Sequence, residues 1–204
     1  MQRQEKSFER VNQKKRTRAE LLRAARELTE QGLQPSVAEV ADHAGISRAT
    51  AYRYFSRPED LIREAALDGV ARGIHVEISK DAGEGPIAAE ERLVDVVAQV
   101  FDMVEANEPM FRALLAGSAT GKGATKRGGR RLGWLSEALE PVRGDLSPKE
   151  FRRLVHALGL TTGIETFVVF KDICELDVDE ARETTLWTAR MLLAGVLASR
   201  KAGG

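Results

Sequence analysis

The sequence has a single cysteine, Cys174, among 204 residues. One thiol excludes an internal disulfide and is typical of proteins that stay in a reducing compartment. No apolar run reaches the roughly 18 residues that a membrane-spanning helix requires. The basic N-terminal segment also lacks the apolar stretch of a secretory signal. These absences favour a cytoplasmic protein without a membrane partner.

Aromatic residues are also scarce, at 5% of the chain, whereas 30% of the residues are charged and 43% are hydrophobic. The abundance of Ala, Leu, Glu and Arg favours helix, and we expect an all-α protein that is long enough to bury a core. The formal net charge is zero. However, residues 1–57 carry about +5 and the remainder about −5, which is compatible with a polyanionic partner at the N-terminal end only.

Residues 36–55, SVAEVADHAGISRATAYRYF, have the pattern of two short helices joined by a tight turn. Ser36 is placed to cap the first helix, Gly45 can adopt the left-handed conformation that ends it, and Ser47 is placed to cap the second. The first helix has the i, i+3, i+4, i+7 spacing of a buried face, formed by Val37, Val40, Ala41 and Ala44.

The second helix of this pattern would bury Ala51 and Phe55, which are four residues apart. Its opposite side would then carry Arg48, Ala49, Thr50, Tyr52 and Arg53. Two helices, a short Gly-containing turn and polar groups on the open face of the second helix form a helix-turn-helix, whose second helix lies in the major groove of DNA. The simpler alternative is a solvated helix whose tyrosines pack on the neighbouring helices.

This stretch resembles the DNA-binding segment of the tetracycline-repressor (TetR) family of bacterial transcriptional regulators. The positions that match the family pattern in register are Ser36, Val40, Ala41, Ala44, Gly45, Ile46, Ser47, Thr50, Ala51, Tyr52, Tyr54 and Phe55. With its flanking helices the resemblance covers about a quarter of the chain. It implies an N-terminal three-helix DNA-binding head and a C-terminal helical ligand-binding and dimerisation body, with about nine helices in all.

On this basis we expect three parts: a mobile basic arm at residues 1–16, a helix-turn-helix domain at residues 17–57, and a ligand-binding and dimerisation domain at residues 58–204. Thr17 and Glu20 have the spacing of a capping box, which would begin the first helix of the head.

The predicted DNA contacts lie on the second helix, at the two cap positions and at the edges of the head. Arginines can bond guanine edges or phosphates, hydroxyls can donate to phosphates, and Thr50 can contact a base or a thymine methyl group. The basic residues 14–18 fit either a solvated tail or a phosphate contact. In the resembling family a lysine at the position of Pro58 often contacts phosphate, and Arg57 is the neighbouring substitute here. The full set is Arg18, Ser36, Ser47, Arg48, Ala49, Thr50, Tyr52, Arg53, Tyr54 and Arg57.

Two long helices are predicted near the C-terminal end, over residues 148–174 and 179–199. Their apolar faces are wider than a thin monomeric body would cover. In the resembling family such a pair meets its copy in a four-helix interface, so the resemblance implies a homodimer through the last two helices. The predicted interface residues are Phe151, Leu154, Val155, Trp187, Met191 and Gly195.

The resemblance also implies an inducer pocket among the body helices, for an unidentified small molecule. Positions that combine apolar bulk with hydroxyl groups suit a mostly apolar ligand, although ordinary core residues have the same composition. The candidate pocket residues are Phe101, Val104, Phe111, Leu115, Trp134, Leu158, Thr162, Thr166 and Phe170.

The sequence shows no catalytic, metal-binding or cofactor-binding set. Its histidines, His43, His75 and His156, are far apart in the chain, so a metal site would need carboxylates from several helices. The Gly-rich segment 117–129 lacks the order Gly, four residues, Gly-Lys-Ser/Thr of a phosphate-binding loop, and we interpret it as a surface loop.

We therefore predict a sequence-specific DNA-binding transcriptional regulator without a cofactor, a repressor released from its double-stranded operator by a small ligand. Two other classes stay open. One is an activator or a ligand-independent regulator bound to DNA. The other is a small helical enzyme that carries a helix-turn-helix, and the lack of an acid, base or nucleophile constellation argues against it.

Overall fold

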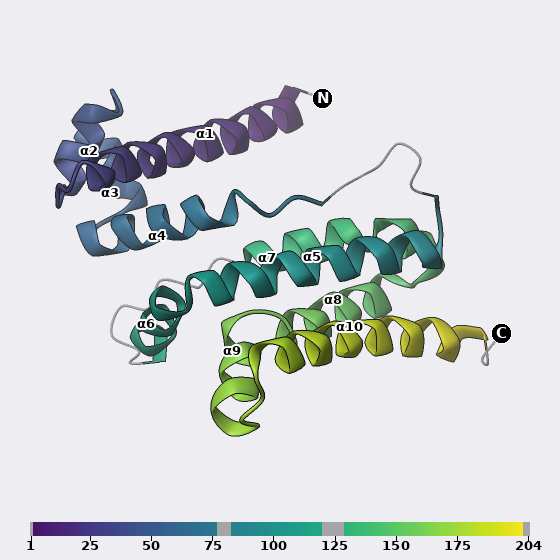
Figure 1. Ribbon diagram of the computed structural model, residues 1–204. Helices are drawn as coiled ribbons and strands as arrows, with labels where there is room; N and C mark the ends of the chain where they lie inside the picture. Colours follow the sequence, from purple (N-terminus) through teal and green to yellow (C-terminus); the bar gives the residue numbers. More distant parts are fainter. Residues whose placement is uncertain (1, 77–82, 120–128, 202–204) are drawn as a thin grey trace. The chain divides into compact units, whose positions relative to one another are not determined.

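The computed structural model describes residues 2–76, 83–119 and 129–201. In these residues every regular element is helical and no strand occurs, which confirms the predicted all-α class. Contacts divide the chain into two units, Met1–Arg72 and Gly73–Gly204 (Figure 1). The elements are α1 Gln2–Glu30, α2 Val37–His43, α3 Arg48–Tyr54, α4 Pro58–Ala71, α5 Pro86–Ala106, α6 Glu108–Ala119, α7 Arg130–Ala138, the 3₁₀ helix η1 Glu140–Asp145, α8 Pro148–Leu160, α9 Ile164–Val168, the π-helix η2 Val169–Ile173, and α10 Val178–Lys201.

The first helix, α1, is longer than the sequence predicted, because it begins at Gln2 and runs to Glu30. Residues 2–16 contain no Pro or Gly and many Gln, Glu, Lys and Arg residues. These side chains lose little freedom in a helix, so nothing in the stretch interrupts it. Thr17 is therefore an interior helical residue, and it does not begin the helix in a capping box with Glu20.

The N-terminal unit packs α1, α2, α3 and α4 around one small core. Many of the core side chains are alanines, which allow helix axes to approach closely. Leu61 and Ala65 of α4 belong to this core, so α4 packs with the head, whereas the sequence prediction placed residues 58 onward in the body. The buried side chains are Leu21, Leu22, Ala24, Ala25, Val37, Val40, Ala41, Ala51, Phe55, Leu61 and Ala65.

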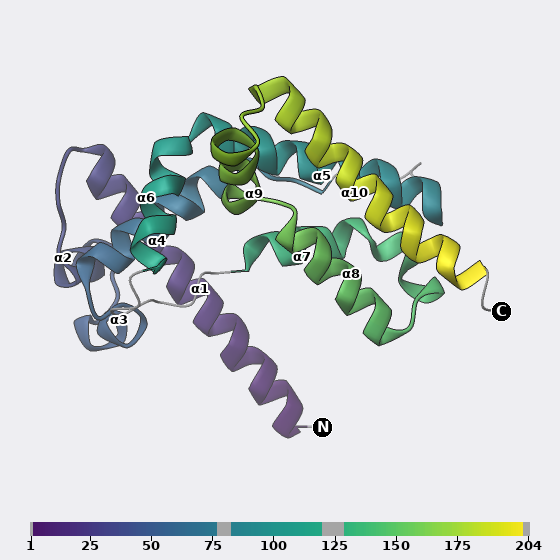
Figure 2. The ribbon, with the colours of Figure 1, turned by 90° about the horizontal axis from the view of Figure 1, so that it is seen from below.

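The C-terminal unit is built around α5, which packs against α7, α10 and η1, while α8 packs against α7 and α10. Figure 2 shows these helices beside one another. Their shared core includes Leu93, Val96, Val97, Val100, Leu135, Leu139, Leu154, Leu158 and Leu193. A second, smaller core joins α5 and α9 to the start of α10, and is formed by Phe101, Val104, Ile164, Phe167 and Ala181.

The long helix predicted over residues 148–174 is broken in two places. α8 ends at Leu160, and α9 starts after Gly163, whose φ of 113° and ψ of −167° lie in a region that only glycine adopts readily. The hydroxyl of Thr162 donates to the carbonyl oxygen of Leu158 at 2.6 Å. After Val168 the helix widens into the π-helix η2. Apolar periodicity continues across the break, and the sequence prediction therefore missed it.

Two further findings concern single segments. Within the described residues no single helix is both long and apolar enough to cross a membrane, and one pair bent by 45°, Pro148–Leu160 with Ile164–Ile173, has the length and composition of a span.

The Gly-rich segment 117–129 lies mostly outside the described residues, because 120–128 are not among them, and its interpretation as a loop stays a prediction.

Candidate nucleic-acid interface

Local hydrogen bonds build the turn between α2 and α3. Ser36 caps α2, because its hydroxyl accepts from the N–H of Glu39 at 3.2 Å and its own N–H donates to the Glu39 carboxylate at 2.8 Å. Gly45 has a φ of 66°, which lets the chain reverse after α2. The N–H of Ile46 then donates to the carbonyl oxygen of Ala41 at 2.9 Å. The caps and the turn confirm the helix-turn-helix predicted from the sequence.

The orientation of α3 follows from its cap and its buried face. The hydroxyl of Ser47 accepts from the N–H of Thr50 at 3.3 Å and donates to the Thr50 hydroxyl at 2.8 Å. Ala51 is fully buried and Phe55, directly after α3, is 5% exposed. The side that faces away from this core carries exposed residues at i, i+1, i+4 and i+5, namely Arg48, Ala49, Tyr52 and Arg53.

Arg48 lies in a bidentate ion pair that the sequence analysis did not foresee. Its Nε donates to Oδ1 of Asp42 at 3.1 Å, and its Nη2 donates to Oδ2 at 2.7 Å. The Arg48 guanidinium lowers the pKa of Asp42, and Asp42 in turn raises the pKa of Arg48. The two residues are six apart on different helices, so helical periodicity carries no signal of the pair.

Arg53 differs from Arg48, because among the described residues it takes part in no ion pair. Tyr52 is 50% exposed beside it. Tyr54 is only partly exposed and packs against the core of the N-terminal unit. Arg57 pairs with Glu59 at 3.4 Å. The open face of α3 therefore offers one cation without a carboxylate partner and one phenol group.

Arg18, which the sequence analysis counted among the DNA contacts, is bound inside the N-terminal unit. Its Nη2 donates to Oε2 of Glu64 at 2.6 Å, and its guanidinium lies 5.5 Å from the ring centroid of Phe55. Glu64 is 7% exposed, and a buried carboxylate requires such a partner. The sequence alone does not predict this pair, because the pair depends on the packing of α1 against α4.

The remaining cations of α1 form a separate exposed group. Lys14, Lys15 and Arg16 are all exposed and lie one turn or less before Arg18. They belong to the continuous helix and not to an irregular arm. Their positive charges provide a site where a phosphate backbone can be held without base recognition.

A sequence profile of the bacterial regulatory proteins of the tetR family matches residues 21–65, which run from the buried part of α1 into α4. The matched residues include the whole helix-turn-helix of α2 and α3. The match agrees with the helix-turn-helix geometry of α2 and α3, and it supports a role in DNA-binding regulation of transcription. A solved transcriptional regulator of the TetR/AcrR family from Thermobifida fusca YX-ER1 is similar, with 20% identity and a TM-score of 0.44 over 88% of this chain and 97% of that chain. The search of curated proteins gave no match.

The pocket residues predicted from the sequence resemblance lie mainly in two groups. Five of them, Phe101, Val104, Phe111, Leu115 and Phe170, belong to or pack against the smaller core. There the rings of Phe101 and Phe167 lie with centroids 5.3 Å apart. Leu158 and Trp134 belong to or pack against the main core instead.

The hydroxyl groups predicted to line the pocket already have backbone partners. Thr162 donates to the carbonyl oxygen of Leu158, and Thr166 donates to that of Leu160 at 3.1 Å. The sequence prediction treated these threonines as polar groups available to a ligand. Their backbone partners lie at the break between α8 and α9, which the sequence analysis did not foresee.

The predicted dimer residues also separate by exposure. Phe151, Leu154 and Val155 of α8 are buried in the core of their own unit. Trp187 is 59% exposed, Met191 is 47% exposed and Gly195 is exposed, and the three follow one another at i, i+4 and i+8 on α10. Leu160, at the end of α8, is 74% exposed. Exposed apolar surface of the last helices thus lies on α10 and the end of α8, and also on η2, where Val169 and Ile173 are exposed.

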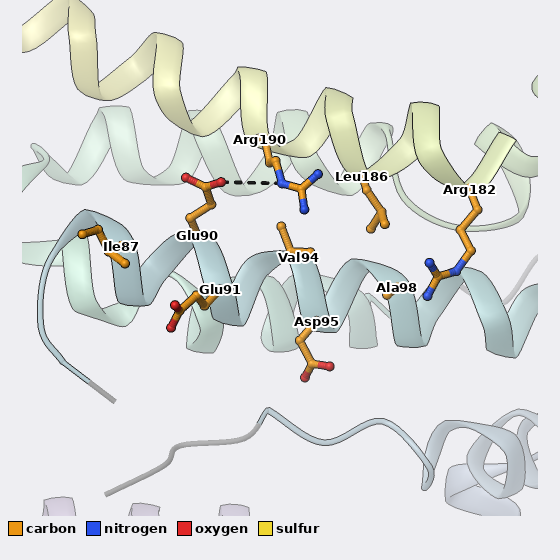
Figure 3. Close-up of a pocket in the computed structure, with 9 residues that line it drawn as sticks. All are labelled: Ile87, Glu90, Glu91, Val94, Asp95, Ala98, Arg182, Leu186 and Arg190. Carbon is orange, nitrogen blue, oxygen red and sulfur yellow. Dashed lines mark ion pairs between the residues drawn. The ribbon is translucent and has the colours of Figure 1, made fainter. Parts of the chain in front are cut away.

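A groove lies between α5 and α10 (Figure 3). Arg190 pairs with Glu90 at 3.5 Å across it, and Arg182 pairs with Asp102 at 2.8 Å at one end. The predicted pocket residues are not among those that line it, which are Ile87, Glu90, Glu91, Val94, Asp95, Ala98, Arg182, Leu186 and Arg190. Both arginines of the groove are thus bound to carboxylates. Among the described residues no group of three or more His, Cys, Asp or Glu side chains is arranged to hold a metal ion.

Proposed function

We propose that the chain is a homodimeric repressor that leaves its operator when a small, mostly apolar molecule binds the C-terminal unit. The observation that carries the proposal is the open face of α3, where Ala49, Tyr52 and Arg53 are exposed while Ala51 anchors the helix in the core. The match of residues 21–65 to the profile of tetR regulatory proteins supports a DNA-binding role for that face. Dimerisation and ligand response are the two properties that the proposal adds.

On DNA, α3 enters the major groove with its exposed face toward the base edges. Arg53 and Tyr52 contact bases or the flanking phosphates, and Ala49 and Thr50 allow close approach to a thymine methyl group. The phosphates on either side are bound by the capped helix starts at Ser36 and Ser47, by Tyr54 and Arg57, and by the exposed cations of α1. Arg18 is not part of the proposed set, because its guanidinium is bound to Glu64.

The proposed dimer forms through α10 together with the end of α8. Trp187, Met191 and Gly195 make one stripe, and the exposed Leu160 adds apolar area. Such side chains are typical of the core of a subunit interface. A twofold partner also supplies the second α3, and half-sites on DNA are spaced by about 34–36 Å or a multiple of it.

The proposed ligand binds at the smaller core, where α6 and α9 meet α5. Phe101, Phe111, Leu115 and Phe170 supply apolar surface there, and this lining favours a mostly apolar molecule. Ligand binding would favour a dimer whose two α3 helices no longer match the half-site spacing. The protein would act in the cytoplasm, where bacterial chromosomal DNA lies.

Selection of binding sites from a randomised pool of duplexes tests the DNA-binding part. The full-length protein should enrich one sequence with two related half-sites, and sedimentation should give a mass of two chains on one duplex. Failure to enrich any sequence, or one chain per duplex at saturation, would contradict the proposal.

A panel of medium-chain fatty acids and aromatic hydrocarbons tests the ligand part. At least one class should raise the melting temperature of the protein and release the selected duplex. Transcription in vitro from a promoter that contains the selected site should fall when protein is added, and a rise would favour the activator alternative.

A further inference from the structure

One carboxylate reaches across the helix-turn-helix and holds the first residue of α3. Asp42 lies in the last turn of α2 and Arg48 is the first residue of α3. The pair is on the surface, since the side chains are 52% and 65% exposed. Neither charge is buried, so stabilising a buried charge is not the role of this pair. Its place beside the exposed face of α3 points instead to a role at that face.

The geometry of the pair determines which donors of Arg48 are occupied. A guanidinium has five N–H donors in a fixed plane. Asp42 accepts from Nε and from one hydrogen of Nη2, along one edge of the plane. The second Nη2 hydrogen and both Nη1 hydrogens, along the opposite edges, are not used by Asp42. Two parallel N–H groups of this kind match the O6 and N7 acceptors of guanine.

The pair also changes what Arg48 contributes electrostatically. Asp42 is ionised at neutral pH, and the guanidinium lowers its pKa further below the ordinary 3.8. The pair therefore carries no net charge, and a phosphate gains little long-range attraction from it. Arg53, on the same face, has no such partner among the described residues and keeps its full charge. The two arginines of α3 are thus suited to different tasks.

We propose that Asp42 is a positioning residue that sets the sequence specificity of α3, by holding Arg48 so that its free edge reads a guanine. This inference rests on the proposed DNA-binding role of α3. In this arrangement Arg53 gives affinity for any duplex, and the Asp42–Arg48 pair gives discrimination between sequences. A bidentate clamp suits this task because it removes most of the rotamer freedom of the arginine before DNA arrives.

The test compares binding-site selection and affinity for the full-length wild type, Asp42→Ala, Arg48→Ala and the double variant. Each protein is given the same randomised duplex pool at one salt concentration, followed by anisotropy titrations with the enriched duplex and with a scrambled one. We expect Asp42→Ala to lose about tenfold in discrimination at one G·C position of each half-site. Arg48→Ala should lose preference at the same position, and the double variant should be no worse than Arg48→Ala.

A matched control separates positioning from a simple gain of positive charge. Glu27→Ala removes one carboxylate from the same unit, where Glu27 pairs with Arg23 and His43 and not with α3. It should leave the enriched sequence unchanged. Asp42→Asn keeps one acceptor and the shape of the side chain, so it should give an intermediate loss, and it serves as the second variant if Asp42→Ala melts early.

Two results would overturn the inference while leaving the proposed function intact. In the first, Asp42→Ala enriches the wild-type sequence with equal discrimination. It also binds all duplexes more tightly, with a log–log salt slope steeper by about 1.8, because the dimer frees two arginines at about 0.9 each. In the second, the losses of the two single variants add in the double variant. If the wild type itself enriches no sequence, the proposed function fails first.

Discussion

The two units of the chain offer different surfaces to a partner. In the N-terminal unit, ion pairs such as Arg18–Glu64 hold helices together, and Arg53 stays unpaired on the exposed face of α3. In the C-terminal unit, ion pairs join helices in the same way, but the exposed face of α10 carries Trp187 and Met191. The first surface suits a polyanion and the second suits another apolar surface. A substitution can therefore alter the exposed face of α3 without changing that of α10, and the reverse.

The largest expected effect comes from placing a charge on the apolar stripe of α10. Trp187→Glu should abolish the dimer, because an interface that closes on a twofold axis would bury two unpaired carboxylates. Operator affinity should fall by at least a hundredfold, since a monomer engages a single half-site. Sedimentation equilibrium and anisotropy titration measure the two effects.

Ile87→Glu is the matched control for this variant, because Ile87 is also an exposed apolar residue but lies on α5. It should remain a dimer with unchanged affinity. If Trp187→Glu is still dimeric at micromolar concentration, the α10 stripe is not the interface.

The next effect concerns the unpaired cation of α3. Arg53→Ala should weaken binding to the selected duplex by roughly tenfold or more, because each dimer loses two contacts. Arg23→Ala removes an arginine from the same unit, but one that pairs with Glu27 on α1, and it should bind normally. Anisotropy titrations at several salt concentrations give both the affinity and the slope. Equal losses for the two variants would mean that only the net charge of the head matters.

The difference between the units also explains which features could be predicted. In the N-terminal unit the caps at Ser36 and Ser47 and the turn at Gly45 depend on residues within three or four positions, so the sequence alone predicts them. In the C-terminal unit the break after α8 accompanies an ion pair between Arg131 and Glu165, which are 34 residues apart. This pair joins α7 to α9, and two residues so far apart in the chain leave no local pattern in the sequence.

Candidate site residues follow the same division. Exposed Ala49, Tyr52 and Arg53 were predictable because α3 has one clear buried face. The internal pairing of Arg18 was not, since it needs the packing of α1 on α4. Periodicity predicted the apolar side of α10, but it could not predict that Leu154 is buried in its own unit. An apolar face does not show whether its own unit or a partner covers it.

Two glycine substitutions, one in each unit, compare the units by their effect on stability. Gly45→Ala should lower the free energy of unfolding by about 1–2 kcal/mol, because the backbone at Gly45 is left-handed. A Cβ there meets nothing within 4 Å, so the backbone strain is the whole cost. Gly163→Ala should cost more, about 3 kcal/mol, because its backbone lies in a region that only glycine adopts readily. The new Cβ would also displace the Arg131 guanidinium from its ion pair with Glu165. Urea unfolding followed by tryptophan fluorescence reports on the C-terminal unit, which holds both tryptophans, and circular dichroism reports on the whole chain.

In an Arg131→Ala background the excess cost of Gly163→Ala should shrink, since the collision is removed. An excess that persists unchanged would place the strain in the backbone alone.

The smallest expected effect is the pH dependence of the ion pairs that join α6 to η2. Lys171 and Arg112 lower the pKa of Glu108 below its ordinary 4.5, and Arg112 lowers the pKa of Asp172 below its ordinary 3.8. A carboxylate with a lowered pKa in the folded state binds fewer protons than in the unfolded state, so it stabilises the fold above its ordinary pKa. That contribution is lost as the pH falls through the folded-state pKa.

Glu108→Gln should therefore lower the melting temperature by roughly 2 °C at pH 7, and the difference from wild type should shrink below pH 4.5. Glu137→Gln, on the exposed side of α7 and outside the ion pairs of the described residues, should melt like the wild type at every pH. The effect is small because the pairs are partly solvated and screened by water. A difference that grows toward acidic pH would reverse the assignment, because it would mean that protonated Glu108, and not its carboxylate, holds α6 against η2.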